Sequence, residues 1–329
     1  MNVLYVGYRD LNHSSAGGYD KIMHYPEAET LVDKDVPFGS ILLNHRGKTL
    51  NLFFLDVVAR FKRYKFDVTH FIYSDITCTF PYSRSRKHKI VATVHLDLCK
   101  RNELHNHLMF DTFLSTLKSM DGVIALSSYQ QQELINKYQI NAVYIPHGFE
   151  IPLYNSINVE MDWGQINVCF SGSNYRDIDT FIKVVSYCFH NRKDIIFHAL
   201  GQSDLVKSKL STFSNVKCYP RVSDDEYFSI ISKCDYNFLP LTFATANNAL
   251  LEAEFLGISS ILPRIAGVFD YAAPEPLNLF YSDYEELVKI FTNISKKEID
   301  DRIIEYSRRF LWSNVYSQLK AFYESLFVD

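Results

Sequence analysis

Residues 236–263, YNFLPLTFATANNALLEAEFLGISSILP, carry the clearest indication of the fold. The stretch begins and ends with short apolar runs, at 236–239 and 259–263, and such runs are typical of buried strands. Between them, Asn247 precedes an apolar helical pattern, and asparagine is a common N-cap residue of helices. The stretch therefore predicts a strand, a loop, a helix and a second strand, which is the unit from which parallel sheets are built.

The same alternation of short apolar runs and longer helical patterns continues through the rest of the chain. We expect further strands at 3–6, 41–43, 68–73, 90–94, 122–125, 142–145, 166–171, 195–200, 216–219 and 279–281. We expect helices at 19–25, 50–64, 108–119, 128–138, 180–188, 205–213, 224–233, 249–256 and 283–295, and one long helix at 307–327. Nearly continuous apolar strands that alternate with helices predict an α/β fold whose parallel sheets are covered on both faces.

Length sets the expected number of domains. At about 100–200 residues per domain, a chain of 329 residues indicates two domains. Residues 146–163 contain two prolines and show weak periodicity, as expected of a linker. We therefore expect one Rossmann-like domain at 1–150, a second at 151–306, and a C-terminal helical segment at 307–329.

Composition excludes several classes of protein. With 47% apolar and 22% charged residues the chain is neither coil-like nor collagen-like, and its net charge of −4 does not by itself predict nucleic-acid or membrane binding. The six cysteines are scattered without a C-x-x-C pair, which favours buried thiols in a reducing compartment over disulfides or a zinc site. No signal-peptide pattern and no apolar run of about 18 residues is found, so we expect a cytoplasmic protein.

Two loops in the first half are candidates for ligand binding. The loop after the first strand ends in Gly17 and Gly18 before a helical pattern, a layout that suits a phosphate cradle and that a plain tight turn would also explain. His95 follows the strand at 90–94, and ligands of open α/β sheets bind beyond the carboxyl ends of the strands. A histidine there can bind a hydroxyl or move a proton, or it can be an ordinary residue at the edge of the core.

Three further stretches, taken in order, resemble a known family. Residues 142–148 run from a strand into Pro146-His147-Gly148, residues 166–176 run from a strand through Ser171-Gly172-Ser173 to Arg176, and residues 252–267 contain Glu252, Ala253, Gly257 and Gly267 at the expected spacing. Together these motifs resemble the GT-B glycosyltransferases of family 4, and the resemblance covers nearly the whole chain. It implies two Rossmann-like domains facing a cleft, with a C-terminal helix that returns to the N-terminal domain.

The resemblance also implies an activity and a set of site residues. The activity is transfer of a sugar from a nucleoside diphosphate sugar, with UDP favoured and GDP next, to a glycan, glycolipid or other hydroxyl acceptor, with retained configuration and no metal ion or other cofactor. Catalytic roles are implied for His95 and Arg176. Contacts to the donor diphosphate are implied for Gly17, Gly18, Ser173, Arg176, Asn247, Asn248 and Ala249, and contacts to the nucleoside for Glu252, Tyr219, Arg221 and Val222.

The sequence departs from the family pattern at two positions. Ala244 stands where the family has a first glutamate, and Ser173 stands where it has an arginine, although Arg176 lies near the position of the family's lysine. These departures keep two alternatives open. One is a non-catalytic nucleotide-binding or scaffold protein, and the other is a sugar-nucleotide epimerase, for which no convincing set of carboxylates is present.

Two basic clusters, RFKRYK at 60–65 and RSRKHK at 84–89, stand out in the first half. They are either solvated surface segments or a surface that meets an anionic acceptor or anionic lipid headgroups. Peripheral contact with the inner face of a membrane is therefore one expectation. Transfer to DNA through the same clusters is a further alternative, but we expect no nucleic-acid partner.

Overall fold

The computed structural model describes residues 1–8, 14, 16–24, 28–36, 45–78, 80–99, 107–159, 161 and 163–328. The chain divides into two compact units. The first unit contains the N-terminal strand, Gly18–Phe149 and Trp312–Asp329. The second contains Glu150–Leu311 and the short segment Ser14–Gly17.

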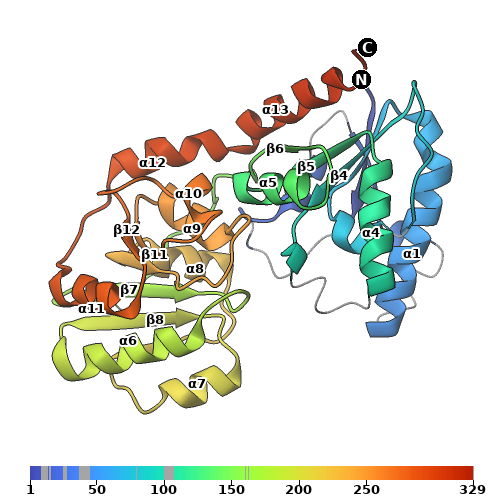
Figure 1. Ribbon diagram of the computed structural model, residues 1–329. Coiled ribbons are helices and arrows are strands. Elements are labelled where there is room, and N and C mark those ends of the chain that lie inside the picture. The colour runs from blue at the N-terminus through green and yellow to red at the C-terminus, as the bar shows by residue number, and fades with distance from the viewer. Residues whose placement is uncertain are drawn as a thin grey trace. The chain divides into compact units, whose positions relative to one another are not determined.

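The first unit is built on a six-stranded parallel sheet with the order β2-β1-β3-β4-β5-β6 (Figure 1). Its strands are β1 (Val3–Gly7), β2 (Ala28–Val32), β3 (Val68–Phe71), β4 (Lys89–Val94), β5 (Gly122–Ala125) and β6 (Ala142–Tyr144). Its helices are η1 (Tyr19–His24), η2 (Asp33–Asp35), α1 (His45–Lys62), η3 (Arg63–Lys65), α2 (Ser74–Thr77), α4 (His107–Ser119), α5 (Ser128–Asn136) and α13 (Trp312–Ser325). Strand β2 was not expected, and the expected strand at 41–43 lies outside the described residues.

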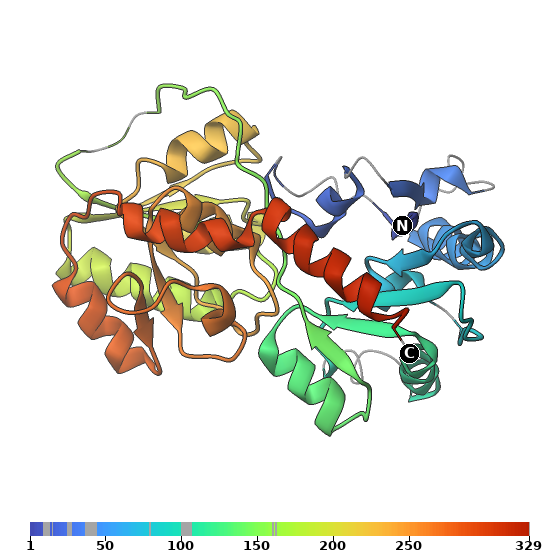
Figure 2. The same ribbon diagram turned by 90° about the horizontal axis from the view of Figure 1, so that it is seen from above.

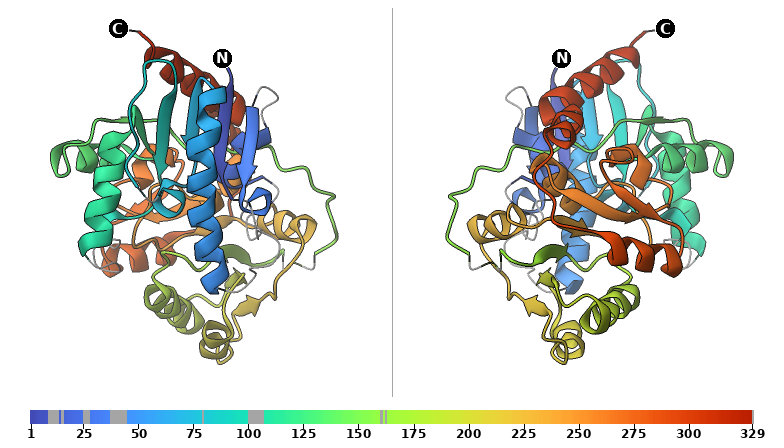
Figure 3. Two further views of the ribbon diagram at one scale, coloured as in Figure 1. Left: turned by 90° about the vertical axis from the view of Figure 1, so that its right-hand side faces the viewer. Right: turned by 90° about the vertical axis from the view of Figure 1, so that its left-hand side faces the viewer.

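Alternate residues of these strands fill two cores, one on each face of the sheet. Leu4 on β1 packs in a core with Leu55 of α1 and Phe113 of α4, and both helices lie in front of the strands in the left view of Figure 3. Tyr5, the next residue of β1, points into the other core, which contains Leu319 of α13. Figure 2 shows α13 lying across that sheet. The period of two along the strand explains why adjacent residues serve opposite cores.

The second unit has a six-stranded parallel sheet with the order β12-β11-β10-β7-β8-β9. Its strands are β7 (Ile166–Ser171), β8 (Ile195–Leu200), β9 (Val216–Cys218), β10 (Tyr236–Phe238), β11 (Ser259–Pro263) and β12 (Leu279–Tyr281). Its helices are α6 (Ile178–Asn191), α7 (Asp204–Leu210), α8 (Asp224–Ile231), α9 (Asn248–Phe255), α10 (Val268–Tyr271), α11 (Tyr284–Asn293), α12 (Asp301–Ser307) and η4 (Arg308–Phe310). The predicted α/β class with two parallel sheets is confirmed.

The helix predicted at 307–327 begins too early, because the structure starts α13 at Trp312 and ends it at Ser325. Helix α12 ends at Ser307, the turn η4 follows, and Leu311 has an extended ψ of 140° before α13 begins at Trp312. The backbone N–H of Trp312 donates to the Phe149 carbonyl at 3.1 Å. The apolar pattern runs through the break because Phe310 packs on Tyr271 in the second unit, whereas Trp312 is buried in the first.

Glycine is required where Trp312 enters the core of the first unit. A Cβ atom placed on Gly148 would lie 2.3 Å from the indole of Trp312. No side chain fits at that distance. Gly148 of the Pro146-His147-Gly148 motif is therefore needed for the packing of Trp312.

Two expectations concerned the burial of the cysteines and the absence of a membrane-spanning segment. All six cysteines are free, but Cys99 and Cys218 are exposed, so the expectation of buried thiols holds for only four. Cys218 is exposed because it ends β9, which lies at the edge of its sheet. Within the described part of the chain, no helix has the length and apolarity to cross a membrane.

Candidate functional site

The loop that follows β7 holds a cation at the carboxyl edge of the second unit's sheet. Arg176 donates from Nε to the Ser171 carbonyl at 3.0 Å and from Nη1 to the Asn174 carbonyl at 3.0 Å. Gly172 has φ +77°, and a Cβ atom there would lie 3.2 Å from Nη2 of Arg176. Glycine therefore supplies both the left-handed turn and the room for the guanidinium.

The same guanidinium reaches the start of α9. Its Nη2 lies 3.4 Å from Oδ1 of Asn247, the oxygen that also accepts the backbone N–H of Leu250 at 3.2 Å. Asn247 is thus the N-cap of α9, which confirms the sequence expectation for this helix. The amide groups of Asn248 and Ala249 belong to the first turn, whose backbone N–H groups have no partner within the helix.

Positive charge therefore accumulates at this point of the fold. The partial positive charge of a helix N-terminus and the full charge of Arg176 both attract an anion, and Glu252, whose charge acts to raise the pKa of Arg176, offsets part of this positive charge. The three acceptors of Arg176 are neutral oxygens. Burial lowers the pKa of Arg176 to about 10, which leaves the guanidinium charged at neutral pH. The arrangement suits a phosphate group.

Glu252 lies one turn into α9 and is buried, with 4% of its surface exposed. Its Oε2 accepts the hydroxyl of Tyr227 at 2.7 Å, and its Oε1 accepts the hydroxyl of Ser14. Burial and the adjacent Glu252 raise the pKa of Tyr227 well above its usual range, so this phenol remains a donor. The carboxylate is held as an acceptor in a fixed orientation.

The segment Ser14–Gly17 joins the second unit at this carboxylate. The Gly17 N–H donates to Oγ of Ser14 at 3.1 Å. A Cβ atom on Gly17 would lie 3.0 Å from both Cγ of Asn248 and Oε1 of Glu252. Gly17 therefore lies against the start of α9, and a side chain at this position would require Asn248 or Glu252 to shift.

Gln202, at the end of β8, supports the loop that carries Arg176. Its Nε2 donates to the carbonyls of Gly172 at 3.0 Å and Leu200 at 2.8 Å. Gln202, Tyr227 and Ser14 were not predicted from the sequence. Each is a single polar residue in an ordinary local pattern, and its importance comes from contacts with distant parts of the chain.

The residues predicted to contact the nucleoside lie around the end of the edge strand β9. The hydroxyl of Tyr219 bonds Nδ1 of His198 at 2.8 Å, and the two rings stack. Burial lowers the pKa of His198 to about 4 and raises that of Tyr219 to about 12, so both groups are neutral at pH 7. Val222 packs on the core beneath α8, and Arg221 is exposed.

Three other residues of the predicted pattern also lie in the second unit. Ser173 is exposed in the Arg176 loop, and Ala244 is 4% exposed in the loop after β10. Gly267 has φ +83° and caps the short helix α10. The structure thus brings Gly17, Arg176 and the start of α9 together around Glu252, whereas Tyr219 and Arg221 lie at the end of β9.

Gly18 and His95 belong to the first unit. Gly18 has φ +101° and precedes η1, so the helix expected after the glycines is a short 3-10 helix. His95 follows β4, and its Nε2 donates to the Ile72 carbonyl at 2.7 Å because a carbonyl can only accept. Its ring packs edge-on against Tyr19, with centroids 4.9 Å apart.

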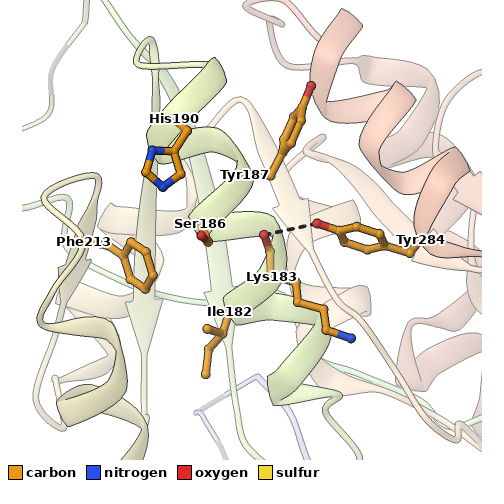
Figure 4. A pocket seen from close by; sticks show the side chains of 7 residues that line it. All are labelled: Ile182, Lys183, Ser186, Tyr187, His190, Phe213 and Tyr284. Carbon is orange, nitrogen blue, oxygen red and sulfur yellow. Dashed lines mark hydrogen bonds between the residues drawn. The ribbon is translucent and has the colours of Figure 1, made fainter.

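A groove of 460 Å³ opens elsewhere on the second unit (Figure 4). It lies along α6, and its lining residues are Ile182, Lys183, Ser186, Tyr187, His190, Phe213 and Tyr284. The Tyr284 hydroxyl donates to the Lys183 carbonyl at 3.3 Å. The lining includes neither Arg176 nor Glu252, so this groove is separate from the cationic site. Among the described residues, no three His, Cys, Asp or Glu side chains are grouped so that they could hold a metal ion.

Comparison with solved structures identifies the fold as that of GT-B glycosyltransferases. Sucrose-phosphate synthase from Thermosynechococcus elongatus is similar over 99% of this chain and 88% of its own, with a TM-score of 0.68 and 15% identity. HepE from Anabaena, in complex with UDP and glucose, is similar over 99% of this chain and 100% of its own, with a TM-score of 0.69 and 13% identity. The apo form of the lipopolysaccharide outer core galactosyltransferase WaaB covers 97% of this chain and 98% of its own, with a TM-score of 0.66 and 13% identity.

At these identities the similarity establishes the fold. Neither a protein-family model nor a curated protein sequence matches this chain.

Proposed function

We propose that this protein is a glycosyltransferase that moves a sugar from a nucleoside diphosphate sugar to a hydroxyl acceptor. One observation carries the proposal: the Arg176 guanidinium and the N-terminus of α9 converge one turn away from the buried carboxylate of Glu252. A cation and free amides suit a diphosphate, and a carboxylate suits the vicinal hydroxyls of ribose. The whole arrangement lies where open α/β sheets bind ligands.

In this proposal the donor is a UDP-sugar, with a GDP-sugar as the next choice. The fold is shared with HepE, whose structures contain UDP and UDP-glucose. Glu252 binds the ribose, and Tyr219, Arg221 and Val222 contact the base. The predicted roles of Gly18 and His95 remain predictions from the sequence.

The chemistry follows from where charge develops during transfer. As the glycosidic bond breaks, negative charge grows on the leaving diphosphate, and Arg176 together with the amides of α9 stabilises it. These groups are already oriented by Ser171, Asn174 and Asn247, so little reorganisation is needed. We propose a transfer without a metal ion or cofactor and with retained configuration, and both points rest on the resemblance to family 4.

Nucleotide binding is the direct test. Thermal shift and calorimetry with UDP, GDP, ADP, CMP and dTDP are compared for wild type, Glu252→Ala and the exposed control Glu305→Ala. We expect one nucleotide to stabilise wild type and the control, because a ligand that binds only the native state raises its stability. Glu252→Ala should weaken that nucleotide about tenfold, as expected for a lost hydrogen bond to a charged group.

The outcomes also separate the two alternatives. No stabilisation by any nucleotide would favour a scaffold protein that retains the fold. A nucleotide sugar that is isomerised in the absence of an acceptor would favour an epimerase. Release of the nucleoside diphosphate only when a glycan or lipid acceptor is added supports transfer.

The structure brings the two basic clusters of the first unit side by side. Arg60 donates to the Pro81 carbonyl at 3.0 Å, and Arg63 donates to the Ser83 carbonyl at 3.1 Å. Tyr64 packs edge-on against His88. The side chain of Arg63 is buried in these contacts, so this cation is not part of a solvated charge run as the sequence suggested.

The surface around these contacts is both basic and aromatic. Phe61 is 76% exposed, Tyr64 56% and Phe80 49%. The exposed basic residues nearby are Lys65, Arg84, Arg86 and Lys87. We propose that this basic-aromatic patch contacts anionic lipid headgroups, because basic residues attract the negative surface and aromatic rings settle at the interface.

Sedimentation with vesicles tests the basic-aromatic patch. Binding should require an anionic lipid such as phosphatidylglycerol and should weaken with salt. The double variant Lys65→Glu/Lys87→Glu should lose it, whereas Lys193→Glu/Lys209→Glu, which changes exposed lysines of the second unit, should retain it. Equal binding to neutral vesicles, or salt-sensitive binding to DNA instead, would contradict the lipid proposal.

A further inference from the structure

The loop that carries Arg176 also holds an aromatic residue in an unusual backbone conformation. Tyr175 has φ +54°, in the left-handed region that glycine and asparagine usually occupy. Backbone bonds fix this geometry on both sides: Thr242 N–H donates to the Tyr175 carbonyl at 2.9 Å, and Asp177 N–H donates to the Pro240 carbonyl at 2.7 Å. A bulky side chain in a conformation that costs energy is a reason to look for a function of that side chain.

The Tyr175 ring packs against Phe243, which lies in the loop after β10. The ring centroids are 5.3 Å apart, with an angle of 57° between the planes. Both side chains are only partly buried. Arg176 and Leu241 form a β-bridge beside the pair, so the two aromatic rings are joined to the backbone that positions the cation.

The order of the strands gives this aromatic pair a definite place along the edge of the sheet. The strands lie side by side in the sheet in the order β9-β8-β7-β10. In the chain, Tyr219 follows β9, Arg176 follows β7 and Phe243 follows β10. Arg176 therefore lies between Tyr219 and Phe243, and Tyr175 is its neighbour in the same loop. A nucleoside diphosphate sugar is an extended molecule in which the diphosphate joins the nucleoside to the sugar. With the nucleoside toward Tyr219 and the diphosphate at Arg176, the sugar comes to the side of β10.

We infer that Tyr175 and Phe243 form the wall that contacts the transferred sugar of the donor. This inference rests on the proposed function and adds a subsite to it. Aromatic faces pack against the C–H groups of a pyranose ring. The pair then determines how well a sugar is recognised, whereas Arg176 and Glu252 determine how well the nucleotide is recognised.

The test uses the substitution Tyr175→Gly, which removes the ring and leaves a residue that adopts φ +54° without strain. Calorimetry compares UDP with UDP-glucose, UDP-galactose and UDP-N-acetylglucosamine for wild type and the variant. We expect UDP affinity to stay within twofold and the affinity for the UDP-sugar that wild type binds best to fall about five- to tenfold. Phe243→Ala should act in the same direction, and Tyr187→Ala, which removes a ring from the groove on α6, should change neither affinity.

Other outcomes overturn the inference in distinguishable ways. If Tyr175→Gly leaves both UDP and UDP-sugar affinity unchanged, the ring does not touch the sugar. If both fall equally, the ring acts on the phosphate loop through Arg176 and not on the sugar. If wild type binds UDP but no UDP-sugar, the subsite is absent while nucleotide binding stands. If wild type binds no nucleotide, the proposed function fails and this subsite fails with it.

Discussion

In the second unit, β7 ends in a loop that carries the cation Arg176, whereas in the first unit the strands end among aromatic rings and the buried carboxyl group of Asp75, which accepts the His95 N–H at 2.8 Å. Tyr8, Tyr73 and His95 follow β1, β3 and β4, and Tyr73 packs against both other rings with centroids 4.6 Å apart. Both sheets are parallel and have six strands. The same architecture thus provides two different chemical surfaces, because the loops beyond the strands, not the sheet, decide what the edge can bind.

The interiors of the two units differ as well. In the first unit, His70 is buried between the hydroxyls of Tyr323 and Thr93, and burial lowers its pKa to about 3. In the second, Glu254 is fully buried, accepts the N–H of Ala273 and the amide of Asn278, and has a pKa raised to about 8 by burial. The first unit therefore holds a neutral base and the second a neutral acid, with opposite consequences for stability when pH changes.

The largest expected effect comes from Glu254. Between pH 4.5 and 8 the unfolded carboxyl loses its proton while the folded one keeps it, so the contribution of Glu254 to stability falls as pH rises through this range. At about 1.4 kcal/mol per pH unit, the loss between pH 5 and 8 is on the order of 3 kcal/mol. We expect Glu254→Gln to remove this loss, because glutamine can keep the same acceptor and carries no charge. Urea denaturation at several pH values measures it.

The exposed Glu305→Gln serves as the control for that series and should reproduce the wild-type pH dependence. A Glu254→Gln variant whose stability falls with pH as steeply as wild type would show that another group causes the dependence. His70 and His198 act in the other direction: their lowered pKa values reduce stability as pH falls below about 6.5, down to about 4 for His198 and about 3 for His70, so acid titration from about pH 6.5 downward reports on them.

A smaller effect distinguishes the two carboxyl edges. Arg176→Ala should weaken nucleoside diphosphate binding about 30-fold, which corresponds to about 2 kcal/mol for a charge-assisted contact. Arg176→Lys should restore part of it, because lysine keeps the charge but not the paired donors. His95→Ala, at the edge of the first unit, should leave UDP affinity within twofold. Calorimetry with UDP gives all three values.

Equal weakening by Arg176→Ala and His95→Ala would contradict the distinction between a cationic edge in the second unit and an aromatic edge in the first. The exposed substitution Arg308→Ala controls for the change in net charge. If Arg176→Ala binds UDP as tightly as wild type, Arg176 does not contact the diphosphate.

The smallest effect concerns the buried network of the first unit. Tyr323→Phe removes the hydroxyl that bonds Nδ1 of His70 at 2.6 Å and leaves a buried ring nitrogen without that partner. We expect a loss of about 1–2 kcal/mol in the free energy of unfolding. The substitution Tyr129→Phe, at a tyrosine that is 44% exposed, should change stability by less than about 0.5 kcal/mol. If Tyr323→Phe leaves the free energy of unfolding unchanged, a water molecule replaces the lost hydroxyl.

The positions of strands and helices were predicted well where the apolar pattern of the sequence is continuous. The strands at 122–125 and 259–263 and the cap at Asn247 have the predicted positions. Strand β2 was missed because it lies at the edge of its sheet, where its first three residues are not buried and the apolar signal is weak. The helix at 307–327 was predicted to begin five residues before Trp312 because Phe310 of η4 and Trp312 of α13 pack in different cores without interrupting the apolar pattern.

Local sequence patterns were enough to predict the alternation of strands and helices, the α/β class, and Arg176, Asn247 and Glu252 as candidate site residues. These depend on local periodicity and on motif spacing, which the chain displays directly. Only the tertiary structure decided that Arg176 reaches a cap 71 residues away, that Tyr227 and Ser14 orient Glu252, and that Tyr175 packs on Phe243. Such contacts depend on strand order and loop geometry, because parallel strands far apart in sequence bring their carboxyl ends to one edge.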